Sequence, residues 1–262
     1  MISAIGNFII AVLKDIRNVA LLFSSIIYWI FFGAFKKKPA KIKAAFYQME
    51  FAGIHSVIIV FFVTVFTGMV LAMQTAYQLE KMGAIIYVAS LVAVSLCREL
   101  SPVLTALVVA GRVGSSIAAE LGTMKVTEQI EGLETMAIDP VRFLAVPRFL
   151  ALFFMLPCLT ILGNLSGILG GFLVGVGSLN INPYLYLQTT FKYLSLKDIY
   201  TGLAKSFIFA IIIALIACYE GLNAQEGAEG VGKATTKSVV ISFILIILAD
   251  CLLTAIFYFS RA

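Results

Sequence analysis

The stretch RELSPVLTALVVAGRVGSSIAAELGTMKVTEQIEGLETMAIDPVRFLAVP, residues 98–147, decides what kind of fold this chain can form. It starts with Arg98 and Glu99 inside a long apolar run, and an apolar run resumes at Pro147. Between the two runs lies a more polar stretch that carries five acidic residues, Glu120, Glu128, Glu131, Glu134 and Asp139. Charges within an apolar segment, followed by a polar helix before the next segment, predict a membrane protein that passes a substrate and is moved by a partner.

The composition of the whole chain places it in a membrane. Hydrophobic residues make up 61% of it, charged residues 13%, and the mean hydropathy is +1.03. A soluble domain carries about 25% charged residues. The apolar runs are continuous and do not alternate with polar residues as barrel strands do, which favours helices. We therefore predict an all-α integral membrane protein.

Five apolar runs are long enough to cross a hydrocarbon core about 30 Å thick. An N-terminal segment, residues 1–45, precedes them, and we expect its apolar part, 19–35, to lie in the membrane interface, although a crossing stays open. The domain division is therefore 1–45 for an interfacial helical segment and 46–262 for the remainder. The expected spans are residues 53–73, 84–110, 149–176, 203–219 and 239–259.

Lysines and arginines predict the orientation. Most of the lysines and arginines outside the spans lie in the N-terminal region, in the loop after the second span or in the loop after the fourth span. In a five-span chain these three segments share one side of the membrane. The positive-inside rule puts that side, with the N-terminus, in the cytoplasm and the C-terminus outside. Lys192, Lys197 and Lys205 count among the minority on the outer side.

A short outer helix is expected after Asn182-Pro183. Asn182 is a possible helix cap, and Pro183 suits the first helical position. Tyr184, Tyr186 and Tyr193 are of the type that gathers at a membrane interface.

Arg98 and Glu99 are the main candidates for a substrate cavity. A charge at membrane depth costs about 2.5–3.5 kcal/mol, so it faces a cavity or a protein partner. Adjacent helical residues do not face each other, so each needs its own partner. Whether they line a cavity or are satisfied by neighbouring helices stays open. Asp250 in the last span is a further buried charge, suited to an interhelical hydrogen bond or to a transport role.

The polar segment 114–140 carries four glutamates among apolar residues at mixed helical spacing. A solvated amphipathic face is the simpler interpretation. The segment is long for a connector, however, and a helix tied to two spans can act on both when a partner docks. The candidate coupling residues are Glu120, Glu128, Glu131 and Glu134.

A run of glycines with a spacing of four occupies the third span. Small residues at this spacing let helices approach closely, and we expect a packing role, with room for a bulky apolar substrate as the alternative. These glycines are Gly163, Gly167, Gly171 and Gly175.

Several kinds of site are not expected in this chain. It has four cysteines at no metal-ligand spacing, a single histidine, His55, and no GxxxxGK[ST] phosphate loop. We predict no catalytic residue, no metal site and no cofactor of its own. The net charge of +5 includes lysines 36–38 beside an apolar segment, which fits an anionic leaflet and not nucleic acid.

Several blocks together resemble the MlaE/YrbE permease family, and the resemblance runs from about Phe46 to the C-terminus. The blocks are RELSPVLT (98–105), GRVGS (111–115), ELGTM (120–124), EQIE (128–131), MAIDP (136–140) and GAEGVG (227–232).

The resemblance implies a permease domain over 46–262 that is the transmembrane subunit of an ABC transporter. Such transporters move phospholipids between the bacterial inner and outer membranes and maintain outer-membrane lipid asymmetry. The family implies a homodimer of five-span chains in the inner membrane, each with an N-terminal interfacial helix. The implied partners are cytoplasmic ABC ATPase subunits that hold ATP and Mg, a STAS-domain protein and a periplasmic MCE-domain hexamer.

For single residues, the resemblance implies a cytoplasmic coupling helix within 120–136 and places Arg98 and Glu99 near an outward-open lipid cavity. We expect Leu71 and Leu104 to give that cavity apolar walls. A proton-coupled secondary transporter of an apolar substrate, using Glu99 or Asp250, is the alternative, although no inverted repeat supports it. A lipid enzyme is less favoured, because no nucleophile with a base is visible.

Overall fold

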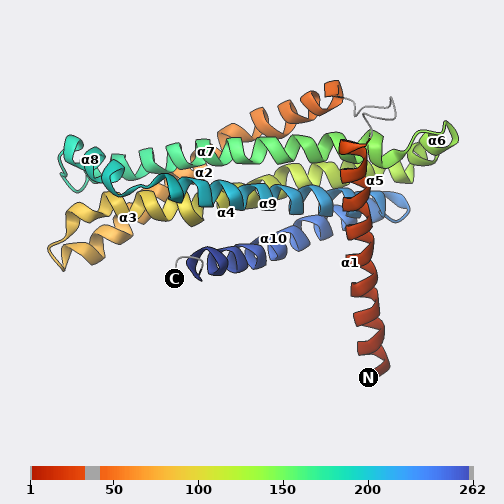
Figure 1. Ribbon diagram of the computed structural model, residues 1–262, viewed down its shortest axis with the longest axis horizontal. Helices are drawn as coiled ribbons and strands as arrows, with labels where there is room; N and C mark the ends of the chain where they lie inside the picture. Colours follow the sequence, from red (N-terminus) through yellow and green to blue (C-terminus); the bar gives the residue numbers. More distant parts are fainter. Residues whose placement is uncertain (1, 33–41, 260–262) are drawn as a thin grey trace. The chain divides into compact units, whose positions relative to one another are not determined.

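The computed structural model describes residues 2–32 and 42–259 (Figure 1). Within these ranges every regular element is helical, which confirms the all-α prediction. The lysines at 36–38, Lys41 and the end of the expected 19–35 segment lie outside the described residues. The elements are α1 (Ile2–Phe31), α2 (Ile42–Glu80), η1 (Ile85–Tyr87), α3 (Val88–Ser95), η2 (Leu96–Leu100), α4 (Ser101–Val109), η3 (Ala110–Gly114), α5 (Ser115–Val126), α6 (Gln129–Thr135), η4 (Val141–Ala145), α7 (Val146–Gly177), α8 (Pro183–Tyr193), α9 (Leu196–Leu222) and α10 (Gly227–Phe259).

Five helical stretches of the described chain are long and apolar enough to cross a membrane, as expected. Helix α1 is not among them, so its predicted place in the interface stays a prediction. The second stretch is continuous from η1 to α5, and the third from η4 to α7. The stretches are Lys43–Glu80, Ile85–Val126, Val141–Gly177, Leu196–Leu222 and Gly227–Phe259.

The chain divides into two compact units, each built from parts of the same long helices. The first unit comprises Met1–Met49, Val113–Leu152 and Ile211–Ser242. The second comprises Glu50–Arg112, Phe153–Ala210 and Phe243–Ala262. The expected domain division between residues 45 and 46 stays a prediction.

The core of the second unit is built mainly from small and β-branched side chains on α2, α3 and α7, together with Leu96 of η2. One buried cluster consists of Ala72, Ala76, Val88, Val92, Leu96 and Val174. Short side chains let these helices lie close together, which matters in lipid because the surrounding tails offer no hydrophobic drive between helices.

The glycines of α7 mark the places of closest approach in this unit. A side chain on Gly167 would meet Leu96, and one on Gly163 would meet Thr105 and Thr64. Gly68 of α2 lies directly against the backbone of Gly167, and Gly170 against the carbonyl of Val65. Gly68 and Gly170 are not among the four glycines spaced by four, yet both lie where the backbone of α2 contacts the backbone of α7.

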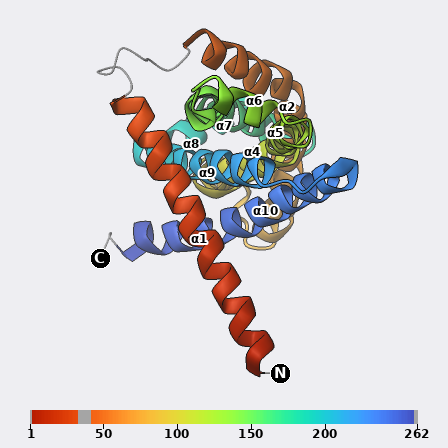
Figure 2. The same cartoon turned by 90° about the vertical axis from the view of Figure 1, so that its right-hand side faces the viewer.

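Helix α8 starts as its sequence predicts and packs against α3 (Figure 1); Figure 2 labels α8 in the view turned by 90°. The Asn182 side chain accepts hydrogen bonds from the backbone N–H groups of Tyr184, at 2.9 Å, and Leu185, at 3.5 Å. The expected interfacial role fits Tyr184, which is 76% exposed, but not Tyr186, which is 1% exposed. Tyr186 fills the space beside Gly171 and Gly175 and contacts Phe172, and its burial raises the pKa of the phenol to about 12.

Within the first unit, α1 packs against η4 and the start of α7. The Trp29 indole donates a hydrogen bond to Asp139 at 3.0 Å, and the rings of Phe23 and Phe149 are 6.2 Å apart. Nearer the start of α1, Asp15 accepts a hydrogen bond of 2.8 Å from the Tyr219 hydroxyl. Helix α1 is thus joined to both α7 and α9 within this unit.

Candidate functional site

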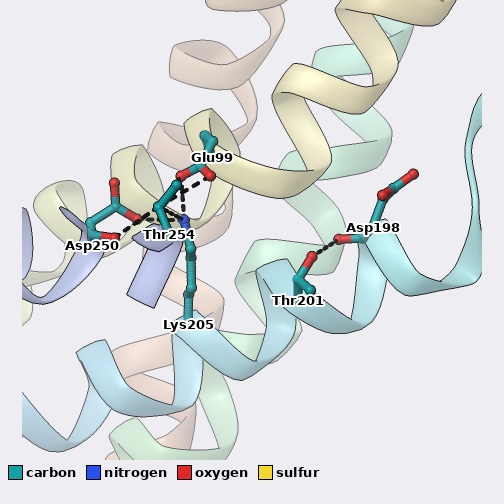
Figure 3. Close-up of polar contacts among 6 residues, drawn as sticks. All are labelled: Glu99, Asp198, Thr201, Lys205, Asp250 and Thr254. Atoms are coloured by element: carbon teal, nitrogen blue, oxygen red, sulfur yellow. Dashed lines mark hydrogen bonds and ion pairs between the residues drawn. The ribbon is translucent and has the colours of Figure 1, made fainter. Parts of the chain in front are cut away.

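A cluster of charged side chains lies inside the second unit, centred on Lys205 (Figure 3). The Lys205 ammonium, 1% exposed, forms an ion pair with Glu99 and a second with Asp250 at 2.8 Å. It also donates a hydrogen bond of 2.7 Å to Thr254. The Thr254 hydroxyl lies 3.2 Å from both Glu99 carboxylate oxygens. One cation therefore connects three candidate spans.

A second ion pair lies beside this cluster. Arg98 places Nε and Nη2 each 2.5 Å from Oδ1 of Asp198, a carboxylate that is 1% exposed. The other oxygen of Asp198 accepts from the Ser195 backbone N–H at 3.0 Å, half of a capping box at the start of α9. Asp198 therefore both starts its helix and neutralises Arg98.

Local helix geometry explains how the sequence assembles this cluster. Arg98 and Glu99 lie in η2, a π-helical turn, a rare form that is frequent at functional sites. Their partners Asp198 and Lys205 are seven residues apart, two turns of α9, and therefore share one face of that helix. Each of the adjacent charges has its own partner, as the sequence led us to expect.

A small cavity opens beside the cluster. Its volume is about 80 Å³. Pockets that enclose drug-sized ligands have about 300–1,000 Å³, so this one holds a few water molecules or part of a ligand at most. It is lined by Arg98, Glu99, Thr201, Lys205, Thr254, Phe257 and Tyr258.

The expected apolar walls do not lie on this cavity. Its lining, taken over the described residues, contains neither Leu71 nor Leu104. Leu71 packs, half-buried, against the core cluster of α2, α3 and α7, and Leu104 is half-buried on α4. Their role in a lipid path stays a prediction.

The four candidate coupling residues lie in two helices and the turn between them. The acidic segment is broken at Glu128, whose φ of 59° is left-handed, so α5 ends at Val126 and α6 starts at Gln129. Glu120 lies on α5 and pairs at 2.8 Å with Arg148, which is 5% exposed. Glu128 and Glu134 are exposed. A hydrogen bond from Lys125 lowers the pKa of Glu131.

Sequence reasoning missed the centre of the cluster. It placed Lys205 among the outer-side charges, and it named Asp250 without a partner. The sequence did show that Lys205 lies two residues inside the expected span 203–219. A lysine near the end of a span usually extends its ammonium to the membrane interface, however, so its position did not indicate that it is buried. In the described part of the chain, no group of three or more His, Cys, Asp or Glu side chains is arranged to hold a metal.

Comparison with known proteins gives the family. The permease MlaE family model matches residues 45–256. A probable ABC transporter permease protein of Rickettsia typhi is 45% identical over 222 residues, 85% of this chain and 86% of that protein. The intermembrane phospholipid transport system permease protein MlaE of Haemophilus influenzae is 37% identical over 98% of this chain and 97% of its own. The chain is a multi-pass membrane protein that belongs to the MlaE permease family of ABC transporter permeases.

Proposed function

We propose that this chain is the transmembrane subunit of an ABC transporter that moves phospholipids between the inner and outer membranes of a bacterium and so maintains outer-membrane lipid asymmetry. The name of the Haemophilus influenzae relative, which specifies intermembrane phospholipid transport, supports this substrate. The chain's own support is the charged cluster in its candidate spans.

The observation that carries the proposal is the open side of that cluster. Arg98 and Glu99 keep 36% and 39% of their side chains exposed within a candidate span. Lipid tails are a costly environment for charge, so these side chains need water or protein beside them. The 80 Å³ cavity beside the cluster is too small for a phospholipid. A second copy that completes a shared, water-accessible cavity meets both requirements, and we therefore propose a homodimer.

The energy for transport comes, in this proposal, from cytoplasmic ABC ATPase subunits, which hold ATP and Mg. Helix α6 with the turn before it, residues 127–135, is the proposed contact with them. The exposed carboxylates of Glu128 and Glu134 support this contact, because they offer charge to a partner. A STAS-domain protein, a periplasmic MCE-domain hexamer, an inner-membrane location, a cytoplasmic N-terminus and an interfacial α1 complete the proposal.

The proton-driven alternative uses the carboxylates of Glu99 and Asp250. Both are ion-paired with Lys205, an arrangement that a purely structural role explains. No observation favours this alternative over the ATPase-driven one.

The deciding experiment is purification of the tagged chain from its native membrane in mild detergent, followed by mass spectrometry and lipid-transfer assays in vesicles. We expect a copurifying ABC ATPase, an MCE-domain protein and bound phospholipid, with transfer that requires ATP. Transfer that requires a pH gradient and no ATPase would contradict the proposal.

Charge reversal tests the coupling contact. Glu128→Lys should abolish copurification of the ATPase, because it reverses an exposed charge in the proposed contact. Glu229→Lys is the matched control, since Glu229 is an exposed glutamate at the start of α10. Equal ATPase recovery with both variants would remove Glu128 from the contact.

A further inference from the structure

Trp29 and Asp139 form a joint between α1 and the segment that leads from α6 to α7. The indole N–H of Trp29 donates to Oδ2 of Asp139 at 3.0 Å. The other carboxylate oxygen, Oδ1, accepts from the backbone N–H groups of Val141 at 2.9 Å and Arg142 at 3.3 Å. One side chain thus fixes the first turn of η4 and binds a helix 110 residues earlier in the chain.

Two further contacts extend the joint along η4 and α7. The Arg142 guanidinium lies 5.2 Å from the centre of the Trp29 ring, within range of a cation–π interaction. Seven residues after Arg142, on α7, the ring of Phe149 lies 6.2 Å from the ring of Phe23 of α1. On α5, Glu120 pairs with Arg148. The start of α7 is therefore held by α1 and by α5, all within the first unit.

The connection that the joint closes is short and strained. Helix α6 ends at Thr135, and Asp139 follows four residues later. Between them Ala137 has a φ of 56°, a left-handed conformation that costs a non-glycine residue energy and persists only where the surroundings impose it. Directly after Asp139 comes η4, a π-helical turn. A connection of this kind passes a displacement from α6 to α7 only if its own conformation is held fixed.

We propose that Trp29 is a positioning residue for coupling: by holding Asp139 it fixes the α6–α7 connection, so that a displacement of α6 moves α7. The inference rests on the proposed function, in which α6 contacts the ATPase. It assigns α1 a mechanical role in transport in addition to its proposed place in the membrane interface.

Two conservative variants remove the same hydrogen bond from opposite sides. Trp29→Phe keeps an aromatic ring beside Arg142 but has no N–H to donate. Asp139→Asn keeps Oδ1 for the Val141 and Arg142 N–H groups, which turns its NH₂ group toward the indole and leaves no acceptor there. Both variants are assembled into the complete transporter in vesicles, and ATP hydrolysis and lipid transfer are measured together.

We expect both variants to move less lipid for each ATP while they hydrolyse ATP at a nearly unchanged rate. The number of lipids moved per ATP should fall about tenfold in each variant, as expected for a lost hydrogen bond to a charged group. ATP hydrolysis should stay within about twofold of the unchanged transporter. The double variant should be no worse than either single variant, because both remove one interaction.

Tyr219→Phe is the matched control, since it removes the hydrogen bond of 2.8 Å that α1 makes through Asp15, away from the joint. It should leave lipids moved per ATP unchanged. The inference is overturned if the joint variants transfer lipid normally, if their losses multiply in the double variant, or if hydrolysis and transfer fall together with the amount of assembled complex. Failure of the unchanged transporter to move lipid would instead overturn the proposed function.

Discussion

At the scale of single residues, the ammonium of Lys205 is the most consequential group in the second unit. It neutralises carboxylates from two other helices, and its own side chain is almost fully buried. Removing one partner of a buried ion pair leaves an uncompensated charge, which costs about 3–5 kcal/mol.

Lys205→Met should therefore lower the free energy of unfolding of the detergent-purified chain by about 3 kcal/mol, the lower end of that range because Glu99 is partly exposed. Lys197→Met on the same helix is the control, because Lys197 is exposed and its charge is solvated. Denaturant unfolding of both variants gives the comparison. Equal stability of the two would mean that the buried pairs contribute nothing.

Tyr186 offers a pH test at the same scale. Its pKa of about 12 in the folded chain lies above the value near 10 of an unfolded tyrosine. The stability that this shift represents is fully present below about pH 10 and is lost as the pH rises toward 12. Of the ten tyrosines, Tyr186 should be among the last to ionise.

Absorbance titration of tyrosinate in the chain and in Tyr186→Phe checks this expectation. The difference between the two titration curves should correspond to one tyrosine that ionises near pH 12. A difference centred near pH 10 would show that the Tyr186 phenol is solvated.

At the scale of elements, backbone contact between α2 and α7 depends on glycine. A methyl group on Gly170 meets the Val65 carbonyl, whereas one on Gly177, also on α7, meets nothing within 4 Å. Gly170→Ala should destabilise the purified chain by about 1–3 kcal/mol, the usual cost of overpacking. Gly177→Ala should leave its thermal unfolding temperature unchanged or slightly raised. An equal thermal unfolding temperature for the two variants would mean that α2 and α7 move apart at Gly170 without a cost in stability.

Elements also differ in how far sequence could predict them. The five long apolar runs predicted spans because length and hydropathy act locally. The break between α5 and α6 could not be predicted, because it depends on a left-handed glutamate, a conformation that sequence does not favour at that residue. The close approach at Gly68 and Gly170 was also missed, because the partner backbone lies far away in sequence.

At the scale of the whole molecule, the cavity beside the charged cluster, about 80 Å³ in one chain, is too small for the proposed substrate. We expect the chain, once separated from its partner proteins in detergent, to have a protein mass twice the 28.4 kDa of one chain. Native mass spectrometry should find phospholipid on the double-mass species. A single-mass species that retains phospholipid would contradict the proposed dimeric cavity.

The sequence by itself determined the class of molecule, the number of candidate spans, the cap of α8 and the family, because each depends on residues that are near one another in the chain. It also indicated that Arg98 and Glu99 need separate partners. Only the tertiary structure decided which partners these are, because Asp198 and Lys205 come from a helix about 100 residues later. Burial of Lys205 and the joint between Trp29 and Asp139 were likewise decided by packing, since desolvation and contact depend on where distant helices meet and not on local spacing.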